Sequence, residues 1–207
     1  GAAASIRLAM HPHEAPERRF TLDRFLDRNS FTFTNPVTRR QNTYGFASVK
    51  TQAVAAARKV MPMGTTAIFA ANKRGDQGAE GLARELVNQL AQPLPLPAPL
   101  SYAQPGALPP CIAYLEAEYG TAWIGTQAVR HGAVLHHGDI PQETREVLEA
   151  LIRDNVVHLV ICTSTLAEGV NLPIRSLVLY SVQRRRPGGQ QPEAMLARDI
   201  KNLVGRA

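Results

Sequence analysis

Cysteine is scarce in this chain of 207 residues, which contains only Cys111 and Cys162. The two are far apart, and Cys162 falls inside an apolar stretch, so we expect no structural disulfide and a reducing, cytoplasmic environment. No CxxC pair or close cluster of cysteine and histidine occurs, which excludes the common zinc motifs. Apolar runs are short as well, and none reaches the ~20 residues that a membrane-spanning helix requires.

Lysine is the second scarce residue type: four of the 23 basic residues are lysine and 19 are arginine, and the formal net charge is +6. Arginine binds phosphate through two parallel hydrogen bonds, so this surplus is compatible with a nucleic-acid partner. A bias in genomic base composition would produce the same surplus, so charge alone favours nucleic acid only slightly. The hydrophobic content of 44% is sufficient for a core and excludes wholesale disorder.

From about residue 46 onward, apolar strand patterns alternate with helical patterns. We expect strands at 65–71, 133–136, 156–162 and 176–180, and helices at 48–60, 76–90, 112–119, 123–130, 141–152 and 192–204. Asp76 is expected to be the N-cap of the second helix, with Leu82 and Leu86 on its buried face. Strands that alternate with helices predict an α/β fold, a parallel sheet flanked by helices, over residues 46–207.

Two segments fall outside this alternation. Residues 1–45 are expected to form an N-terminal connector or extension, with a short helix over 17–28 and a strand over 30–34. A Pro-rich insertion at 92–110 contains seven prolines, which exclude a helix or a central strand across it. It is either a ligand for a partner domain or a stiff surface insertion, and the second interpretation is favoured.

The run from Thr163 to Pro173 is the most informative feature of the chain. It follows the apolar strand 156–162 and opens with three small hydroxyl residues, Thr163, Ser164 and Thr165. Ligands of open α/β sheets bind at the carboxyl ends of the strands. Hydroxyls and free backbone N–H groups there favour a ligand that carries phosphate.

Four segments at predicted strand ends together carry a family resemblance. They are 68–73, His136-His137-Gly138 with Arg145 and Glu149 downstream, 163–173, and 202–207. This set resembles the second, C-terminal RecA-like (P-loop NTPase-type) domain of superfamily 2 helicases, in the Ski2-like and DEAD/DEAH-box group. The run 163–173 matches the family's motif V, T-x-T-L-A-x-G-V-N-L-P, at every specified position. Motif VI, Q-x-x-G-R-A-G-R, is matched in part: Asn202 replaces its glutamine, and we expect a truncation within the motif at Ala207.

The resemblance implies an ATP site between two RecA-like domains, with Mg²⁺ held by the first domain. Arg206 would be the arginine finger that stabilises charge on the transferred phosphoryl group. Asn202 would contact the nucleotide from the same motif. Three residues of motif V would line the nucleotide cleft: Gly169, Val170 and Asn171. Without the first domain, we expect this chain to be inactive as an ATPase or helicase.

The resemblance also implies a contact with one strand of DNA or RNA. The residues implied are Asn72, Lys73, His137, Gly138, Thr163, Ser164 and Thr165. The threonines could instead cap a turn. His136 and His137 suit joint metal binding poorly, because neighbouring strand residues point to opposite faces, and Arg145 with Glu149 could be a simple helical ion pair. The alternative function is a non-catalytic module that binds nucleic acid or protein on a RecA-like fold.

Overall fold

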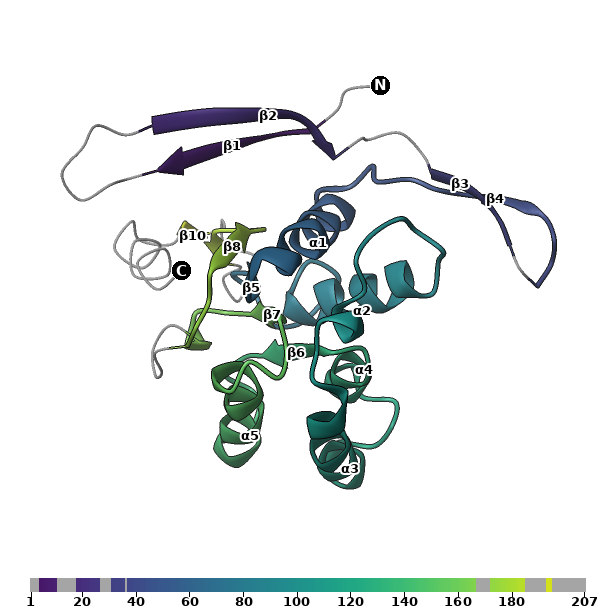
Figure 1. Cartoon of the computed structure of the whole chain (residues 1–207). Helices are drawn as coiled ribbons and strands as arrows, with labels where there is room; N and C mark the ends of the chain where they lie inside the picture. The colour runs from purple at the N-terminus through teal and green to yellow at the C-terminus, as the bar shows by residue number, and fades with distance from the viewer. Residues whose placement is uncertain are drawn as a thin grey trace.

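A parallel four-stranded sheet forms the centre of the molecule. The computed structural model describes residues 4–10, 18–26, 31–35, 37–166, 172–184 and 193–194, with the backbone alone for 4–10, 18–26, 184 and 193–194. The strands are β5 (Thr66–Phe69), β6 (Ala133–His136), β7 (Leu159–Cys162) and β8 (Ser176–Leu179), in the spatial order β6-β7-β5-β8 (Figure 1). All three pairings are parallel. The predicted α/β fold is therefore confirmed.

Helices cover both faces of this sheet. They are α1 (Val49–Val60), α2 (Ala79–Leu90), α3 (Leu108–Tyr119), α4 (Ile124–Arg130) and α5 (Gln142–Arg153), with a 3-10 turn at Met61–Met63 after α1. Phe69 belongs to the core that contains residues of α3 and α5, whereas Ile68 belongs to the core of α1 and α2. Strands β5, β6 and β7 are buried on both faces, and their sequences are correspondingly mostly apolar, as is typical of parallel strands.

The first two helices begin differently. Ser48 caps α1, since its side chain accepts the N–H of Thr51 and a capping box is complete. The prediction of Asp76 as the cap of α2 is wrong. The N-cap is Gly78, and the Asp76 carboxylate binds Lys50 instead. A Cβ at Gly78 would lie 2.3 Å from the carbonyl oxygen of Arg74, so the tight turn before α2 requires glycine.

The N-terminal residues form hairpins. Strand β1 (Ala4–Met10) pairs antiparallel with β2 (Arg18–Leu26), so the helix predicted over 17–28 is wrong. This short segment has apolar residues that fit a two-residue repeat as well as a helical one, and pairing with β1 decides between them. Strand β3 (Phe31–Thr34) is confirmed and pairs with β4 (Gln41–Tyr44).

The C-terminal helix predicted at 192–204 is wrong where it can be compared. Strand β10 (Glu193–Ala194) pairs with β9 (Gln183–Arg184), and the remainder of the predicted helix lies outside the described residues. Among the described residues, no helix combines the length and the apolar character needed to cross a membrane.

The Pro-rich segment 92–107, which we call the strap, packs on the domain. It contains two 3-10 turns, Pro99–Ser101 and Pro105–Ala107, and α3 begins at Leu108, four residues earlier than predicted, because Pro109 and Pro110 are tolerated in a first helical turn. The buried guanidinium of Arg58 donates from Nε to Pro97 O (2.9 Å) and from Nη2 to Leu96 O (2.9 Å). Burial lowers the pKa of Arg58 to about 10. The side chain of Arg58 therefore fixes the strap by binding two of the strap's backbone carbonyls.

Candidate nucleic-acid interface

The carboxyl ends of the four strands lie at one edge of the sheet. Cys162 is in register with His136 on one side and Phe69 on the other, and Phe69 is in register with Leu179. Backbone hydrogen bonds tie the loops beyond these strands: Thr163 N donates to His136 O (3.2 Å) and Ala70 N to Cys162 O (2.9 Å). Three loops that are distant in sequence therefore leave the sheet side by side.

Gly138 is the meeting point of these loops. A Cβ on Gly138 would lie 3.1 Å from Thr165 Oγ1 and 3.8 Å from Lys73 Nζ. The hydroxyl of Thr165 is 3.2 Å from that of Thr163. The structure thus brings together Lys73, Gly138, Thr163 and Thr165, which were predicted from three separate motifs. Ser164 lies half-buried in the same loop as the threonines.

Two charged residues complete this arrangement, and sequence reasoning missed both. Asp139 Oδ1 lies 2.6 Å from Lys73 Nζ, and Asp139 Oδ2 lies 3.2 Å from Arg74 Nε. The hydrogen bond and charge of Lys73 lower the pKa of Asp139, so its carboxylate is ionised at neutral pH. The only signal was position, because Arg74 and Asp139 each follow a predicted site residue. We call Lys73, Arg74, His137, Gly138, Asp139 and Thr165 the edge cluster.

His137 is the buried member of the edge cluster. Its side chain is 5% exposed, and burial lowers its pKa, so the ring is neutral at pH 7. Nδ1 accepts the N–H of Asp139 (3.3 Å), which leaves the proton on Nε2. Nε2 lies 4.0 Å from Glu80 Oε1 and has no hydrogen-bond partner among the described residues. The ring thus stabilises the Gly138–Asp139 turn through Nδ1, and its Nε2–H has no hydrogen-bond acceptor among the described residues.

His136 points to the other face of the sheet. It is fully buried, and its Nε2 donates to Glu149 Oε1 on α5 (2.8 Å), whereas His137 faces Glu80 on α2. Burial is the main cause that lowers the pKa of His136. The two rings therefore point to opposite faces of the sheet, as expected for neighbouring strand residues. The carboxylate of Glu149 therefore binds His136, and the helical ion pair with Arg145 is not needed to explain this residue.

Asn72 is directed away from Lys73. Its Nδ2 donates to Gln183 O (3.2 Å), while the neighbouring N–H of Ala71 donates to Ser181 Oγ (3.1 Å). Asn72 therefore fixes the loop after β8, on the opposite side of β5 from the strands that carry Gly138 and Thr165. Its phosphate contact stays a prediction.

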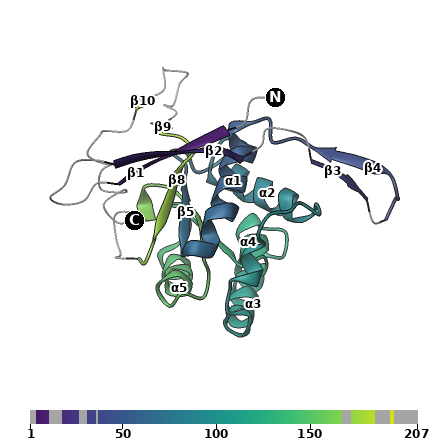
Figure 2. The same cartoon turned by 45° about the horizontal axis from the view of Figure 1, so that its top comes forward.

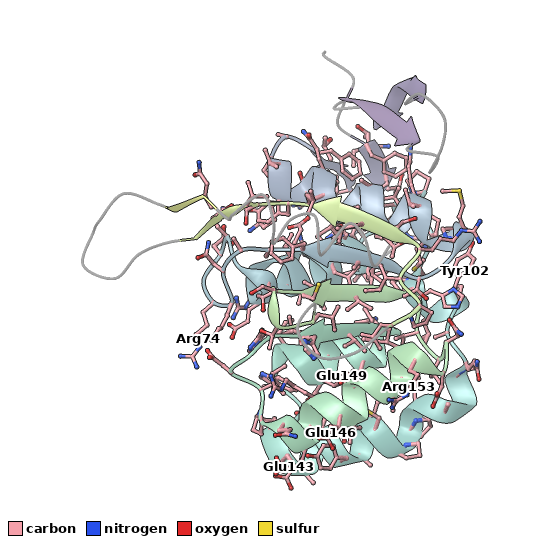
Figure 3. All side chains as sticks on the ribbon, turned by 90° about the vertical axis from the view of Figure 1, so that its left-hand side faces the viewer. Arg74, Tyr102, Glu143, Glu146, Glu149 and Arg153 are labelled. Carbon is pink, nitrogen blue, oxygen red and sulfur yellow. The ribbon has the colours of Figure 1, made fainter. Side chains whose placement is uncertain are left out.

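The residues predicted to bind the nucleotide fall outside the part of the chain that the structure describes. These residues are Gly169, Val170, Asn171, Asn202 and Arg206. Figure 3 shows Arg74 at the carboxyl edge of the sheet and Arg153, at the end of α5, toward the opposite edge. The contrast gives a natural pair of positions for experiments, one at the candidate interface and one remote from it.

The C-terminal part of the chain is similar to known helicases. Residues 113–207 match the family described as "Helicase conserved C-terminal domain". Hel308, an ATP-dependent DNA helicase of Caldivirga maquilingensis, is 27% identical over 147 residues, which are 70% of this chain and 18% of that protein. A POLQ-like helicase of Caenorhabditis elegans is 36% identical over 74 residues, 35% of this chain and 8% of that protein.

Among solved structures, yeast Dbp5 bound to RNA and ADP BeF3 is 20% identical, with a TM-score of 0.40 over 76% of this chain and 28% of that one. The chain spans less than a fifth of the length of the two helicases above. The resemblance drawn from the motifs is confirmed over residues 113–207, the segment that matches the C-terminal domain of helicases.

Proposed function

We propose that this chain is the C-terminal RecA-like domain of an ATP-dependent nucleic-acid translocase, and that its edge cluster grips the phosphate backbone of one strand. The observation that carries the proposal is the convergence of Lys73, Gly138 and Thr165 from three loops onto one point. Such a point offers an ammonium, a hydroxyl and a position without a side chain. These groups suit a phosphate and carry no sequence preference.

Asp139 gives the grip a defined resting state. Its carboxylate holds Lys73 and Arg74 in place while no strand is bound. Both cations are partly exposed (44% for Lys73 and 74% for Arg74), so solvent screens these ion pairs and they are weak. A phosphate can therefore replace the carboxylate at small cost.

The resemblance assigns the nucleotide chemistry to other residues of the chain. Arg206 would stabilise charge on the transferred phosphoryl group, and Gly169, Val170, Asn171 and Asn202 would line the cleft. ATP with its Mg²⁺ would be held mainly by a first RecA-like domain, so the chain alone would not turn over ATP. The names of the relatives, an ATP-dependent DNA helicase among them, support ATP as the fuel and DNA as the first strand to test.

The grip is tested by binding a fluorescein-labelled single-stranded oligonucleotide to the full chain, followed by fluorescence anisotropy. Lys73→Gln removes one phosphate contact and should weaken binding about tenfold and lower the salt slope by about 0.7. Arg153→Gln is the matched control, because it makes the same charge change toward the opposite edge of the sheet (Figure 3). Equal losses in the two variants would show that net charge, rather than the edge cluster, governs binding.

A further inference from the structure

The hairpin of β3 and β4 projects from the side of the α/β body. Both views show it extending away from the helices, with its turn at the far end (Figures 1 and 2). Its residues 31–44 include four threonines, two asparagines, one glutamine and two arginines, and no aspartate or glutamate. The element is therefore positively charged and rich in hydrogen-bond donors along its whole length.

The base of the hairpin is fixed to the domain. Phe46, which follows β4, is buried in a core cluster with Ala55 of α1 and Leu94 of the strap. The ring of Tyr44 packs edge-on against Phe46 at 4.9 Å, and Tyr44 Oη donates to Glu85 on α2. Gln52 Nε2 donates to Phe46 O (2.8 Å). The hairpin thus leaves the body in a set direction.

The turn of the hairpin is ordered by its own hydrogen bonds. Asn35 Oδ1 accepts the N–H groups of Val37 (2.9 Å) and Thr38 (3.0 Å), and Asn35 N donates to Arg40 O (2.8 Å). Arg39 has φ +58°, the left-handed conformation that closes the turn, and its N–H donates to Asn35 O (2.9 Å). A preformed turn loses little backbone entropy when it binds a partner.

The side chains of the two arginines at this turn make no hydrogen bond or ion pair with the rest of the described chain. Both Arg39 and Arg40 are exposed. Arginine places five donors in a planar fork that matches phosphate, and threonine and glutamine side chains donate to phosphate oxygens too. A surface without carboxylates repels no part of a polyanion. Charge complementarity thus selects a nucleic-acid backbone as the partner.

We infer that the β3–β4 hairpin is a second nucleic-acid contact, in which Arg39 and Arg40 bind backbone phosphates outside the segment gripped by the edge cluster. The inference rests on the proposed function, since both contacts serve the same strand or the duplex from which it emerges. It adds a contact from a part of the chain that precedes the segment matching the helicase family. Binding there is sequence-independent, because only phosphates are read.

The test measures anisotropy of labelled single-stranded and duplex oligonucleotides with the full chain between 50 and 200 mM salt. R39Q/R40Q should weaken binding about tenfold and lower the salt slope by about 1.4 on single strands, for two lost phosphate contacts. R39K/R40K keeps both charges and should recover most of the affinity. R130Q/R153Q makes the same change in net charge at exposed helical positions and should have a smaller effect.

Each outcome separates the two proposals. If R39Q/R40Q binds as tightly as the wild type while Lys73→Gln weakens binding, the hairpin inference is overturned and the edge grip stands; the hairpin would then be free to meet a protein partner. If R39Q/R40Q weakens binding and Lys73→Gln does not, the hairpin holds and the edge grip fails. A wild-type chain that binds neither oligonucleotide at 50 mM salt overturns both. Thermal unfolding of each variant checks that the fold is intact.

Discussion

Two groups of polar side chains in this molecule teach opposite lessons. The first, which we call the strap cluster, consists of Arg58, Glu85 and Gln89 with the carbonyls of Leu96 and Pro97. Its three residues are at most 8% exposed, and their side chains bind one another, backbone groups or the hydroxyl of Tyr44. The edge cluster has cations that are 44% and 74% exposed and a buried imidazole N–H without a partner among the described residues.

The difference distinguishes a structural group from one that is ready to bind. In the strap cluster, water does not reach the polar atoms, so each internal hydrogen bond takes the place of a hydrogen bond to water that is lost on folding. In the edge cluster, water and ligands reach most of the charged atoms, so the internal pairs can be exchanged. We therefore expect substitutions in the first group to change stability and substitutions in the second to change binding.

The largest effect is expected from Arg58→Met. This substitution keeps apolar contacts and removes the donors to Pro97 O and Leu96 O and to Gln89 Oε1, which leaves buried acceptors unpaired. We expect a loss of about 3 kcal/mol in the free energy of unfolding, measured by urea denaturation. Lys59→Met, at the next and exposed position, is the control for lost charge and should cost under about 0.5 kcal/mol.

Oligonucleotide binding by Arg58→Met, measured at a temperature where it is folded, should match that of the wild type. A variant that keeps its stability yet loses affinity would reverse the distinction between the two clusters, and would make the strap part of the interface.

The sequence allowed the sheet to be predicted well, for a physical reason. Strands β5, β6 and β7 are buried on both faces, and each is a short, mostly apolar run with turn residues after it. The strand at 133–136 has the predicted bounds. The helix predicted over 17–28 is wrong because a segment of this length carries too few apolar residues to separate the two periods, and pairing with β1 then makes it a strand.

The candidate site was predictable in its parts and not in its assembly. Lys73, Gly138 and Thr165 each stand in a motif, and parallel register then brings them together. Asp139 and Arg74 carried no pattern of their own, since exposed charges are common in loops. The contact of Arg58 with Leu96 spans 38 positions and depends on how the strap folds, which no local rule contains. The assigned roles of Asn202 and Arg206 stay predictions.

A second prediction concerns pH and the two buried histidines of the sheet edge. Burial lowers the folded-state pKa of His136 and of His137 below the ordinary value of about 6.5. The unfolded chain therefore takes up these protons first, so this contribution to stability is complete above pH ~6.5 and is lost as pH falls below it. Each unit by which a folded pKa is lowered corresponds to about 1.4 kcal/mol.

Urea denaturation between pH 7.5 and 5.5, above the range where carboxylates titrate, measures this effect. His136→Gln retains a donor for Glu149 and should make the pH dependence shallower. A stability that is flat over this range in the wild type would mean that the two rings take up protons as readily in the folded state as in the unfolded chain, against their burial.

The smallest effect is expected from Asp139→Asn, and it tests the edge cluster most directly. Removing the carboxylate frees Lys73 and Arg74 for phosphate, so affinity for the labelled oligonucleotide should rise about threefold, while stability changes by under about 1 kcal/mol because these pairs are half-exposed. Asp154→Asn, an exposed acidic residue that directly follows α5, makes the same charge change and should leave affinity nearly unchanged. An affinity that falls in Asp139→Asn would show that the carboxylate positions Lys73 for the strand rather than competing with it. The edge cluster would then resemble the strap cluster in being a fixed arrangement, and the grip would depend on Asp139 rather than on its displacement.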